Sequence, residues 1–373
     1  MVRHTRTDFQ LSCEGSTDVN WKQNINITKN ETLGLDIGSA AVKIVALRKN
    51  GEGYSALAGG ITEVAAAQDD VMRRRANTVK AVRSCFTRTR IKRKLAVCGV
   101  SGPEVAVRDF ELPLLSPEEM TAAVALEASQ VCPFPADASA VDYQLIPNGS
   151  ENAKGVLVAA MRSLIADKRQ IARDARLKCV MMDVDGLALL NCFQGLANDD
   201  EDTETCEACA ILNVGHAHTT LAMMDTNGRP FIRDITYAGD EILRKIIEEN
   251  GAPAETIKEI LSGSSTVAEL GLDESLARAC KKLVTDVNET LRFHTAQGKS
   301  GSIEKLHVCG GFALTGGFIE LLNRQISAEC VLWNPFDRMQ CNPNRRYKDV
   351  FTKRGPALAV AAGLAMRSID TDD

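Results

Sequence analysis

The sequence predicts an α/β protein built as two similar lobes, with a small α+β unit inserted into the first. The chain has 373 residues, which exceeds the roughly 250–300 residues at which single hydrophobic cores stop growing. A strand–turn–strand pattern that begins at Leu35 recurs at Leu212. Between the two copies, residues 104–178 differ in texture, with short strands and a helix bounded by prolines. A repeated unit interrupted by one insert predicts a duplicated, two-lobed fold.

The first 30 residues are polar and show no hydrophobic periodicity, so we expect 1–30 to be a disordered leader. The acidic stretch 198–207 is the best candidate for a linker between the lobes. The expected parts are a first lobe (31–103, 179–205 and 353–369), an inserted α+β unit (104–178) and a second lobe (206–352).

Composition excludes several classes of protein. The hydrophobic fraction of 45% and the charged fraction of 25% are ordinary globular values. Lys+Arg 44 against Asp+Glu 49 gives a net charge of −5, so no nucleic-acid partner is expected. No apolar run approaches the roughly 20 residues that cross a bilayer, and the leader has no signal-peptide core. We therefore expect a cytoplasmic protein whose association with any membrane comes through a partner.

The cysteines and histidines indicate no metal site. Of the 12 cysteines, only Cys206 and Cys209 form a Cys-x-x-Cys pair, without a second pair at metal-ligand spacing. We interpret the cysteines as buried thiols that pack like small hydrophobic groups. His216 and His218 share one face of a strand, but without a third ligand they are interpreted as polar residues beside a turn.

The repeated turns have the chemistry of phosphate binding. Leu35-Asp36-Ile37-Gly38 opens the first copy and Leu212-Asn213-Val214-Gly215 opens the second. Glycine lets the backbone approach a ligand closely, and successive N–H groups form a small anion-binding concavity. The carboxylate of Asp36 can orient waters around Mg²⁺, which prefers oxygen ligands and keeps several waters. Two such turns in matching positions predict a nucleotide cleft between the lobes.

A third glycine element supports the cleft. The stretch 308–317 predicts a strand running into Gly310-Gly311 and then a helix, which leaves bare backbone where a base or ribose can pack.

Two other patterns imitate known motifs but lack a required glycine. Gly298-Lys299-Ser300 imitates a P-loop, but its leading glycine would fall on Phe293. The run 99–102 imitates a nucleophile elbow, but position 103 is proline.

Two helices are predicted, one by its amphipathic pattern and one by its end signals. Residues 71–90 form a basic amphipathic helix, and the basic run 88–94 is interpreted as a solvated helix end rather than a phosphate or membrane patch. Ser116-Pro117-Glu118-Glu119 is a strong helix start, with a cap, a first-position proline and early acids. That helix must stop before Pro133-Phe134-Pro135, because proline cannot continue it.

These elements, in this order, resemble the superfamily of actin, sugar kinases and chaperone ATPases. Within it the chain looks like the PilM family of actin-like type IV pilus assembly proteins, from Thr32 to Arg367. The resemblance implies an actin-like (ribonuclease H-like) fold, in which the insert is similar to the corresponding subdomain of the cell-division protein FtsA. The residues that carry it are Leu35 to Lys43, Leu126-Glu127, Pro133-Phe134-Pro135, Asp142-Tyr143, Val308 to Gly317 and Gly355 to Ala359.

The resemblance also implies ATP and Mg²⁺ as cofactors and assigns roles. Asp36 would hold the magnesium-bound waters, and Asp185 would orient the attacking water. Asn213 stands where many relatives have aspartate, so the resemblance implies slow hydrolysis at most. The residues implied to contact the nucleotide are Gly38, Ser39 and Lys43 in the first turn, Asn213, Gly215 and Thr219 in the second, and Gly239, Gly310 and Gly311 at the adenosine.

The implied partner is the short cytoplasmic N-terminal segment of a PilN-like inner-membrane protein, which would link the chain to the pilus motor in twitching motility. A docking groove around Glu127 and Phe134 is a hypothesis, since Pro133-Phe134-Pro135 also fits a buried helix terminator. Homo-oligomers are possible. The alternatives are a nucleotide-binding pseudo-ATPase scaffold of a secretion system, an FtsA-like filament protein, and a sugar kinase, for which no base facing a second substrate is evident.

Overall fold

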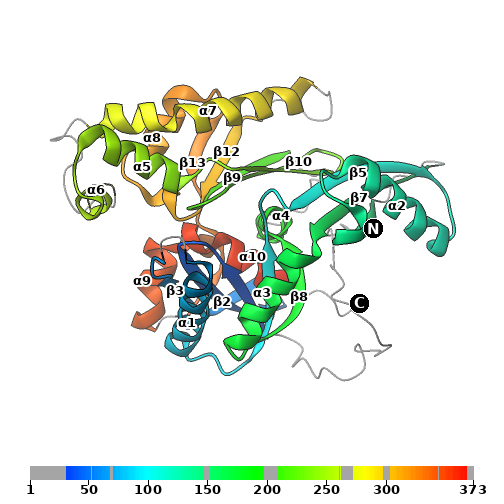
Figure 1. Cartoon of the computed structure of the whole chain (residues 1–373), viewed down its shortest axis with the longest axis horizontal. Coiled ribbons are helices and arrows are strands. Elements are labelled where there is room, and N and C mark those ends of the chain that lie inside the picture. The colour runs from blue at the N-terminus through cyan, green and yellow to red at the C-terminus, as the bar shows by residue number, and fades with distance from the viewer. Residues whose placement is uncertain are drawn as a thin grey trace.

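The computed structural model shows two lobes stacked on each other, with the insert projecting from one side (Figure 1). The predicted leader and the predicted linker 198–207 lie outside the described residues. The structure describes residues 31–51, 53–67, 70–146, 152–196, 208–259, 261, 272–296, 303–342 and 344–367.

The first lobe is built on a six-stranded sheet in the order β14-β3-β2-β1-β4-β8. Strands β1, β2 and β3 form an antiparallel meander, whereas β4 and β8 run parallel to β1. The bounds are β1 Glu31–Ile37, β2 Ala41–Asn50, β3 Gly53–Glu63, β4 Leu95–Val100, β8 Lys178–Val184 and β14 Gln340–Cys341.

The second lobe repeats five of these six strands, and β14 has no counterpart in it. Its five-stranded sheet has the order β11-β10-β9-β12-β13, again a meander followed by two parallel strands. The match between the two sheets confirms the predicted duplication. The bounds are β9 Cys209–Val214, β10 Thr219–Met224, β11 Pro230–Ile235, β12 Lys305–Cys309 and β13 Glu329–Leu332.

The insert has its own sheet and core. Its three strands are β5 Val105–Pro113, β6 Ser139–Ile146 and β7 Asn152–Met161, in the order β5-β7-β6. Helix α2, Pro117–Val131, begins with the predicted capping box: Ser116 Oγ accepts from the Glu119 N–H, and the Glu119 carboxylate accepts from the Ser116 N–H. It packs on the sheet through Met120 and Val124.

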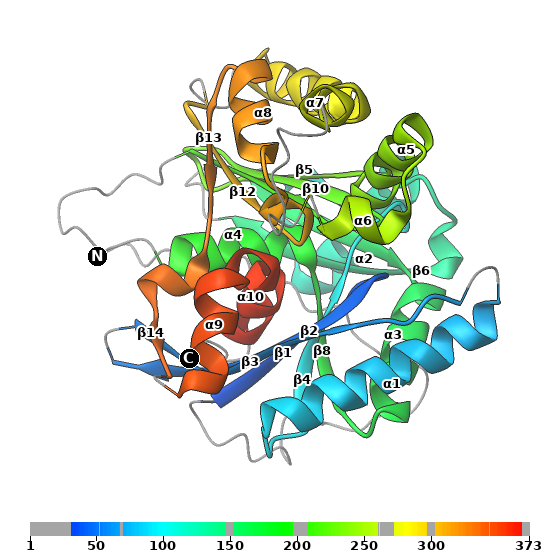
Figure 2. The ribbon, with the colours of Figure 1, turned by 90° about the vertical axis from the view of Figure 1, so that its left-hand side faces the viewer.

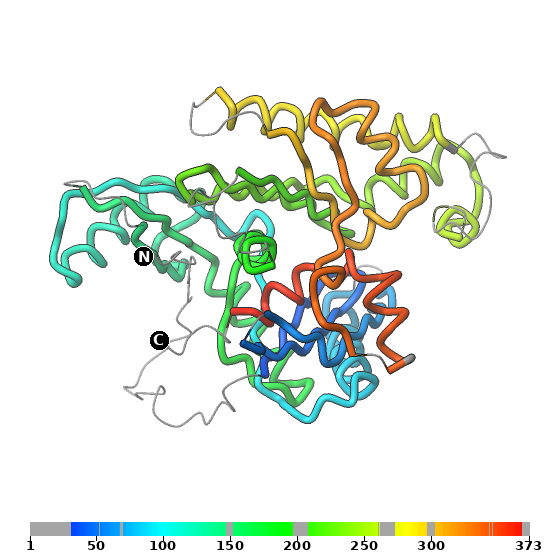
Figure 3. Tube along the Cα trace, turned by 180° about the vertical axis from the view of Figure 1, so that it is seen from behind, coloured from blue at the N-terminus to red at the C-terminus, as the bar shows by residue number. Residues whose placement is uncertain are grey.

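Helices cover both faces of the first sheet. Helices α1, Val71–Thr89, and α3, Arg162–Asp174, lie side by side over one face (Figure 2). Helix α10, Ala359–Arg367, is buried throughout and packs on the other face against α4, Asp185–Gly195. Figure 3 shows α10 in red beside the blue strands of the sheet. A Cβ at Gly34 in β1 would lie 2.0 Å from the Ala361 carbonyl oxygen, so glycine permits this approach.

The second lobe carries its larger helices on the outer side of its sheet (Figure 1). Among the described residues none of the helices is both long and apolar enough to cross a membrane. The bounds are α5 Gly239–Asn250, α6 Ala254–Glu259, α7 Leu272–Ala296 and α8 Phe318–Gln325.

The strand pairings refine the expected parts of the chain. Strand β14 and all but the last residue of helix α9, Arg345–Lys353, lie within the range expected for the second lobe, yet both contact β3 of the first sheet. Helix α3 falls within the range expected for the insert, and it packs on β4 and β8 of the first sheet. The lobe boundaries at fixed residues stay a prediction.

Candidate functional site

Three parallel strands of the first sheet bring polar residues to one edge. Asp36 lies near the end of β1, Ser101 directly follows β4, and Asp185 directly follows β8. The carboxyl ends of parallel strands meet at the same edge of a sheet, where open α/β folds place their ligands. The predicted residues Asp36 and Asp185 are thereby close enough for the charge of Asp36 to raise the pKa of Asp185.

Asp36 is held in a buried ion pair. It lies opposite Lys43 in the register of β1 and β2, and the Lys43 Nζ is 2.7 Å from Asp36 Oδ2. Only 10% of the Asp36 side chain and 17% of the Lys43 side chain are exposed. The two residues therefore present one anionic and one cationic group beside the first turn.

Asp185 combines a positioning bond with an unused oxygen. The Ser101 Oγ donates to Asp185 Oδ2 at 2.7 Å. The other oxygen, Oδ1, is buried and has no hydrogen-bond partner among the described residues. A Cβ at Gly99 would lie 2.0 Å from this oxygen, so only glycine at 99 admits the carboxylate.

Burial is the main cause that raises the pKa of Asp185 to about 7, and the Asp36 charge adds to it. The Ser101 hydrogen bond and the Lys168 charge oppose this rise. A carboxyl group with a pKa near neutrality can exchange a proton at physiological pH, which suits a general base. Perturbation by burial together with a specific charge is typical of functional sites.

Lys168 is a second cation of the site, and sequence reasoning missed it. It belongs to α3, and its Nζ donates to the Ile37 carbonyl oxygen at the first turn. The sequence around Lys168 reads as an ordinary amphipathic helix and gives no signal. Only the packing of α3 on the sheet brings this side chain to the end of β1.

The first turn is tight and leaves amides available. The Gly38 N–H donates to the Ala41 carbonyl oxygen at 3.2 Å, and a Cβ at Gly38 would lie 2.8 Å from that oxygen. Within the described part of the chain, the N–H groups of Ser39 and Ala40 have no backbone acceptor. Ser39 is exposed at the tip of the turn. The turn therefore offers two backbone donors and a hydroxyl to a ligand.

The second turn has the same geometry. The Gly215 N–H donates to the His218 carbonyl oxygen at 3.1 Å, and a Cβ at Gly215 would lie 2.7 Å from that oxygen. The amides of His216 and Ala217 likewise find no backbone acceptor in the described residues. Glycine is needed in both turns because the carbonyl three residues later approaches too closely for a side chain.

The predicted glycines at the adenosine side lie beside the second turn. Gly310 has a φ of 98°, and its Cβ would lie 2.4 Å from the Val214 carbonyl oxygen. The Gly239 N–H donates to the Gly215 carbonyl oxygen at 3.1 Å. Gly311, by contrast, has open space where a side chain would be. The structure thus brings these three glycines together with Gly215.

Two predicted residues of the second turn are engaged internally. Thr219 is fully buried, and its hydroxyl donates to the Tyr237 carbonyl oxygen at 2.9 Å. Asn213 Oδ1 lies 3.9 Å from the Cys309 thiol, which donates to it weakly. The Thr219 hydroxyl therefore stabilises the second turn from the protein interior and does not face the cleft.

A contact between the lobes lies next to Asp185. The Gly102 N–H of the first lobe donates to Asp234 Oδ2 at 2.7 Å, and Thr220 donates its hydroxyl to the same carboxylate. Asp234 and Ser101 were missed by sequence reasoning. The run 99–102, excluded above as a nucleophile elbow, contains a signal for Ser101, since the glycines on either side leave room for the side chains of Asp185 and His218.

The cysteines that the structure describes are free thiols, most of them buried, whereas His216 and His218 lie in the second turn rather than on one face of a strand. Burial raises the pKa of Cys85 to about 11 and that of Cys280 to about 12, so both thiols stay neutral. Cys206 lies outside the described residues. Throughout the described ranges, no three His, Cys, Asp or Glu side chains gather at a metal-binding distance. His216 Nε2 instead lies 3.4 Å from Asp240 Oδ1.

Comparisons with known proteins agree with this architecture. The family model described as type IV pilus assembly protein PilM matches residues 34–369. Among solved structures, a PilM-PilN type IV pilus biogenesis complex aligns at a TM-score of 0.76 with 22% identity, covering 92% of this chain and 99% of that one. The ethanolamine utilization protein EutJ from Carboxydothermus hydrogenoformans aligns at a TM-score of 0.55 with 14% identity, covering 90% and 89%.

The structural likenesses concern the fold, and together with the duplicated sheets they confirm the expected two-lobed, actin-like α/β class. The family match extends over both lobes and the insert, which is well beyond half of the chain. The chain belongs to the PilM family of type IV pilus assembly proteins.

Proposed function

We propose that the chain binds ATP with Mg²⁺ between its two turns and serves type IV pilus assembly as a nucleotide-dependent docking protein. The observation that carries the proposal is the pair of matching turns, each closed by a glycine N–H bond and each with two amides that lack a backbone acceptor among the described residues. Such amides bind phosphate oxygens.

The residues present fit a magnesium nucleotide. Lys43 and Lys168 supply two cations for a triphosphate, and Asp36 supplies a carboxylate for a metal-bound water. Mg²⁺ usually keeps several waters and binds through one or two carboxylates plus substrate phosphates. A site with Asp36 and no cluster of three ligating side chains in the described chain suits that mode.

Each side chain then has a defined task. Ser39 and the turn amides hold phosphate oxygens, and Asn213 orients a water at the second turn. Gly311 leaves open backbone against which the adenosine packs, while Gly239 and Gly310 hold this region close to the second turn. Asp185 Oδ1 accepts a proton from the attacking water, while Ser101 holds the carboxylate in place. The bound magnesium ion supplies charge stabilisation for the phosphoryl group.

Hydrolysis is expected to be slow. Asn213 carries no charge where a second carboxylate would strengthen the hold on metal-bound water, and phosphoryl transfer depends on such electrostatic positioning. Thr219 contributes no hydroxyl to the cleft, because it bonds to Tyr237. The nucleotide therefore acts mainly by holding the lobes in one relative position.

The test is a titration of the purified chain with a fluorescent ATP analogue and Mg²⁺. Asp36→Ala is expected to weaken binding about 100-fold, because it removes the carboxylate and leaves Lys43 without its partner. The matched control is Asp240→Ala, an exposed carboxylate beside the second turn, which should leave affinity within about threefold. Absence of saturable binding by the folded wild type would contradict the proposal and leave a scaffold role.

We further propose that the insert docks the N-terminal cytoplasmic segment of a PilN-like inner-membrane protein, and through it the chain reaches the pilus motor. The PilM of the solved complex is bound to PilN. On the insert, Leu126 of α2 is 62% exposed, next to Glu127, and Phe134 lies half-buried after the helix. An exposed leucine on a helix face is a typical anchor point for a short peptide.

A binding assay with a synthetic peptide of the PilN-like tail tests this docking. Leu126→Ser is expected to weaken binding at least tenfold, the cost of one lost apolar anchor. Leu332→Ser is the matched control, because Leu332 lies in the second lobe and is 46% exposed. It should leave the affinity for the peptide unchanged. Equal affinities for the two variants would place the docking surface elsewhere.

A further inference from the structure

The edge of the first sheet opposite the nucleotide end carries an unusual concentration of positive charge. Residues 71–94, which span α1 and the following loop, contain ten Lys or Arg and no Asp or Glu. Helices α1 and α3 both end at this edge, where β4 and β8 begin, and the Lys178 N–H donates to the Lys94 carbonyl oxygen at 2.8 Å. The two loops are therefore joined into one surface.

We call this surface the basic edge. All of its cationic side chains are exposed, and none forms an ion pair with another residue that the structure describes. The acid at the start of β1, Glu31, is already paired with Arg48. The cations of the basic edge are Arg88, Arg90, Lys92, Lys94, Arg173, Arg176 and Lys178.

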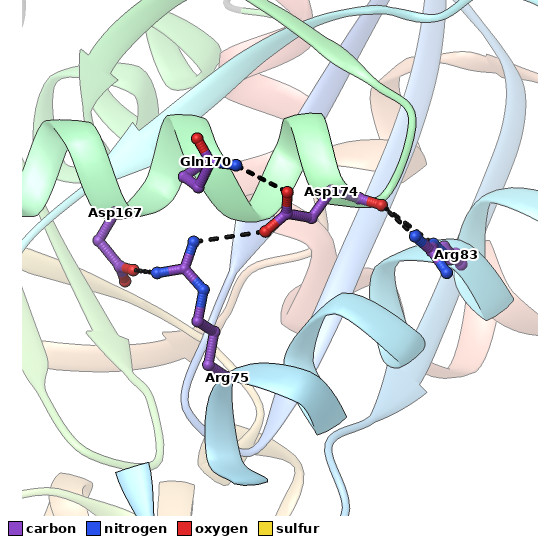
Figure 4. A network of polar contacts seen from close by, with 5 residues as sticks. All are labelled: Arg75, Arg83, Asp167, Gln170 and Asp174. Carbon is purple, nitrogen blue, oxygen red and sulfur yellow. Dashed lines mark hydrogen bonds and ion pairs between the residues drawn. The ribbon is translucent and has the colours of Figure 1, made fainter. Parts of the chain in front are cut away.

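The acids nearest along α3 are also occupied. Arg75 of α1 reaches across to the carboxylates of Asp167 and Asp174, and Arg83 donates to the Asp174 carbonyl oxygen (Figure 4). Gln170 donates to the same Asp174 carboxylate at 2.7 Å. This network fixes α3 against α1 and uses the acids of α3, so the positive charge beyond it is left uncompensated.

Two arginines of the basic edge have a backbone conformation that glycine would adopt more easily, which is a second observation pointing to a role for their charge. Arg90 has a φ of 53° and Arg176 a φ of 67°. Within the described ranges they are the non-glycine residues with positive φ. Both follow the end of a helix, where glycine usually adopts this conformation because a side chain is strained there. Helix dipoles favour a cation or two in the last turn, but they explain neither strained arginines nor the lysines that follow.

We propose that the basic edge binds the anionic phospholipid headgroups of a membrane surface directly and thereby orients the protein. The chain as a whole has a net charge of −5, so everything outside these seven cations sums to −12. An anionic surface attracts this edge and repels the rest, which fixes one orientation. The candidate nucleotide site lies at the other end of the same strands and so faces away from the membrane.

The chemistry favours lipid over nucleic acid. Binding of single strands relies on exposed aromatic side chains that stack with bases. The aromatic residues beside the basic edge are not exposed: Phe86 is half-buried against the core, and Tyr347, whose hydroxyl donates to the Thr89 carbonyl oxygen, is buried. Clusters of four to eight Lys or Arg near a bilayer are typical of sites for anionic lipids. Under this proposal the run 88–94, expected from the sequence to be a solvated helix end, also contacts a membrane surface.

Sedimentation of the full chain with vesicles, without nucleotide or peptide, tests the proposal. The wild type should bind vesicles of phosphatidylcholine mixed with phosphatidylglycerol, and not vesicles of phosphatidylcholine alone. Binding should be lost when salt rises from about 0.1 M to about 0.5 M, because the Debye length falls below the reach of the cations. Failure of the wild type to sediment with the anionic vesicles overturns the proposal, whatever the outcome of the nucleotide titration.

The strained arginines allow a variant that keeps the fold. Arg90→Gly with Arg176→Gly removes two cations at positions where glycine suits the backbone, so stability in urea should be equal or higher. The partition onto anionic vesicles should fall about 20-fold. Lys92→Gln with Lys94→Gln should have a similar effect.

The control variant, Lys258→Gln with Lys281→Gln, removes two exposed cations from α6 and α7 of the second lobe. It should leave the partition unchanged. Equal losses in the control and the edge variants would show a general effect of net charge, and would contradict a specific basic edge.

Discussion

The two turns have the same backbone and different electrostatics. In the first, Asp36 lies opposite Lys43 in the strand register and forms an ion pair with it. In the second, the matching pair is Asn213 opposite Thr220, and both residues are uncharged. Duplication has kept the glycine-closed turn in both lobes, whereas charge is confined to one. The first turn is therefore suited to metal and phosphate charge, and the second to shape and backbone contacts.

Each lobe also has a glycine at the end of the neighbouring parallel strand, and the group that this glycine admits differs between the lobes. In the first lobe, Gly99 of β4 makes room for the Asp185 carboxylate. In the second lobe, Gly310 directly after β12 makes room for the Val214 carbonyl oxygen. The two glycines lie one position apart in the matched registers, because Gly99 corresponds to Cys309. The glycine of the first lobe admits a titratable group and that of the second admits a backbone group, so acid–base chemistry belongs to the first lobe.

The largest expected effect comes from the shape of the second turn. Gly310→Ala should lower the free energy of unfolding by about 2–4 kcal/mol, because the residue has a positive φ and its Cβ would overlap a carbonyl oxygen. Gly311→Ala, at the adjacent open position, should change it by less than about 0.5 kcal/mol. Urea unfolding of the two variants measures the difference. Similar values would mean that the second turn is not defined by this contact.

An intermediate effect concerns Asp185 and depends on pH. Its pKa is raised to about 7 in the folded protein from its ordinary value of 3.8, so the native state holds a proton that the unfolded chain releases. Stability is then lost as pH rises from about 4 to about 7. Asp185→Asn removes that loss, and its gain in unfolding free energy should be about 1–2 kcal/mol larger at pH 8 than at pH 5.

Urea unfolding at the two pH values measures this gain, with Glu255→Gln at an exposed carboxylate as control. An equal gain in unfolding free energy at both pH values would show that burial does not raise the pKa of Asp185.

The smallest effect tests the charge difference directly. Asn213→Asp places a carboxylate in the second turn, where Thr220 offers no cation and Lys43 is already paired with Asp36. Without nucleotide it should lower the unfolding free energy at pH 7 by about 0.5–1 kcal/mol. Asn213→Ser is the neutral control. If both variants lose the same amount, the amide contact rather than the added charge is responsible.

Sequence patterns predicted the elements whose signals are local. The capping box at Ser116, the turns at Gly38 and Gly215 and the strand leading to Gly310 depend on neighbouring residues, and all occur in the structure. Strand β3 was not predicted, because Gly59 and Gly60 lower its β-propensity. The structure gives the reason for these glycines: Phe351 lies against the first, and Thr89 and Cys85 lie against the second.

The unpredicted part of the site depends on tertiary contacts. Lys168 reaches the first turn from 131 residues away, and Asp234 reaches Gly102 from 132 residues away. Neither side chain belongs to a motif, so no local pattern distinguishes it from a solvated charge. The orientation of Thr219 could not be predicted either. A threonine beside a phosphate-binding turn has the same sequence pattern whether its hydroxyl faces the cleft or, as here, bonds to Tyr237 in the core.

The position of α10 determines when the first lobe can finish folding during synthesis. Gly34 in β1 and Gly363 in α10 each bring backbone within a distance that no Cβ would tolerate, so this helix is the inner wall of that lobe. The ribosome makes it some 300 residues after the strands it covers. The second lobe has its sheet and helices complete earlier. The nascent first lobe therefore exposes one apolar face of its sheet until residues 359–367 have been synthesised. An exposed apolar face favours aggregation, so we expect this lobe to be the part of the chain that needs chaperones during synthesis.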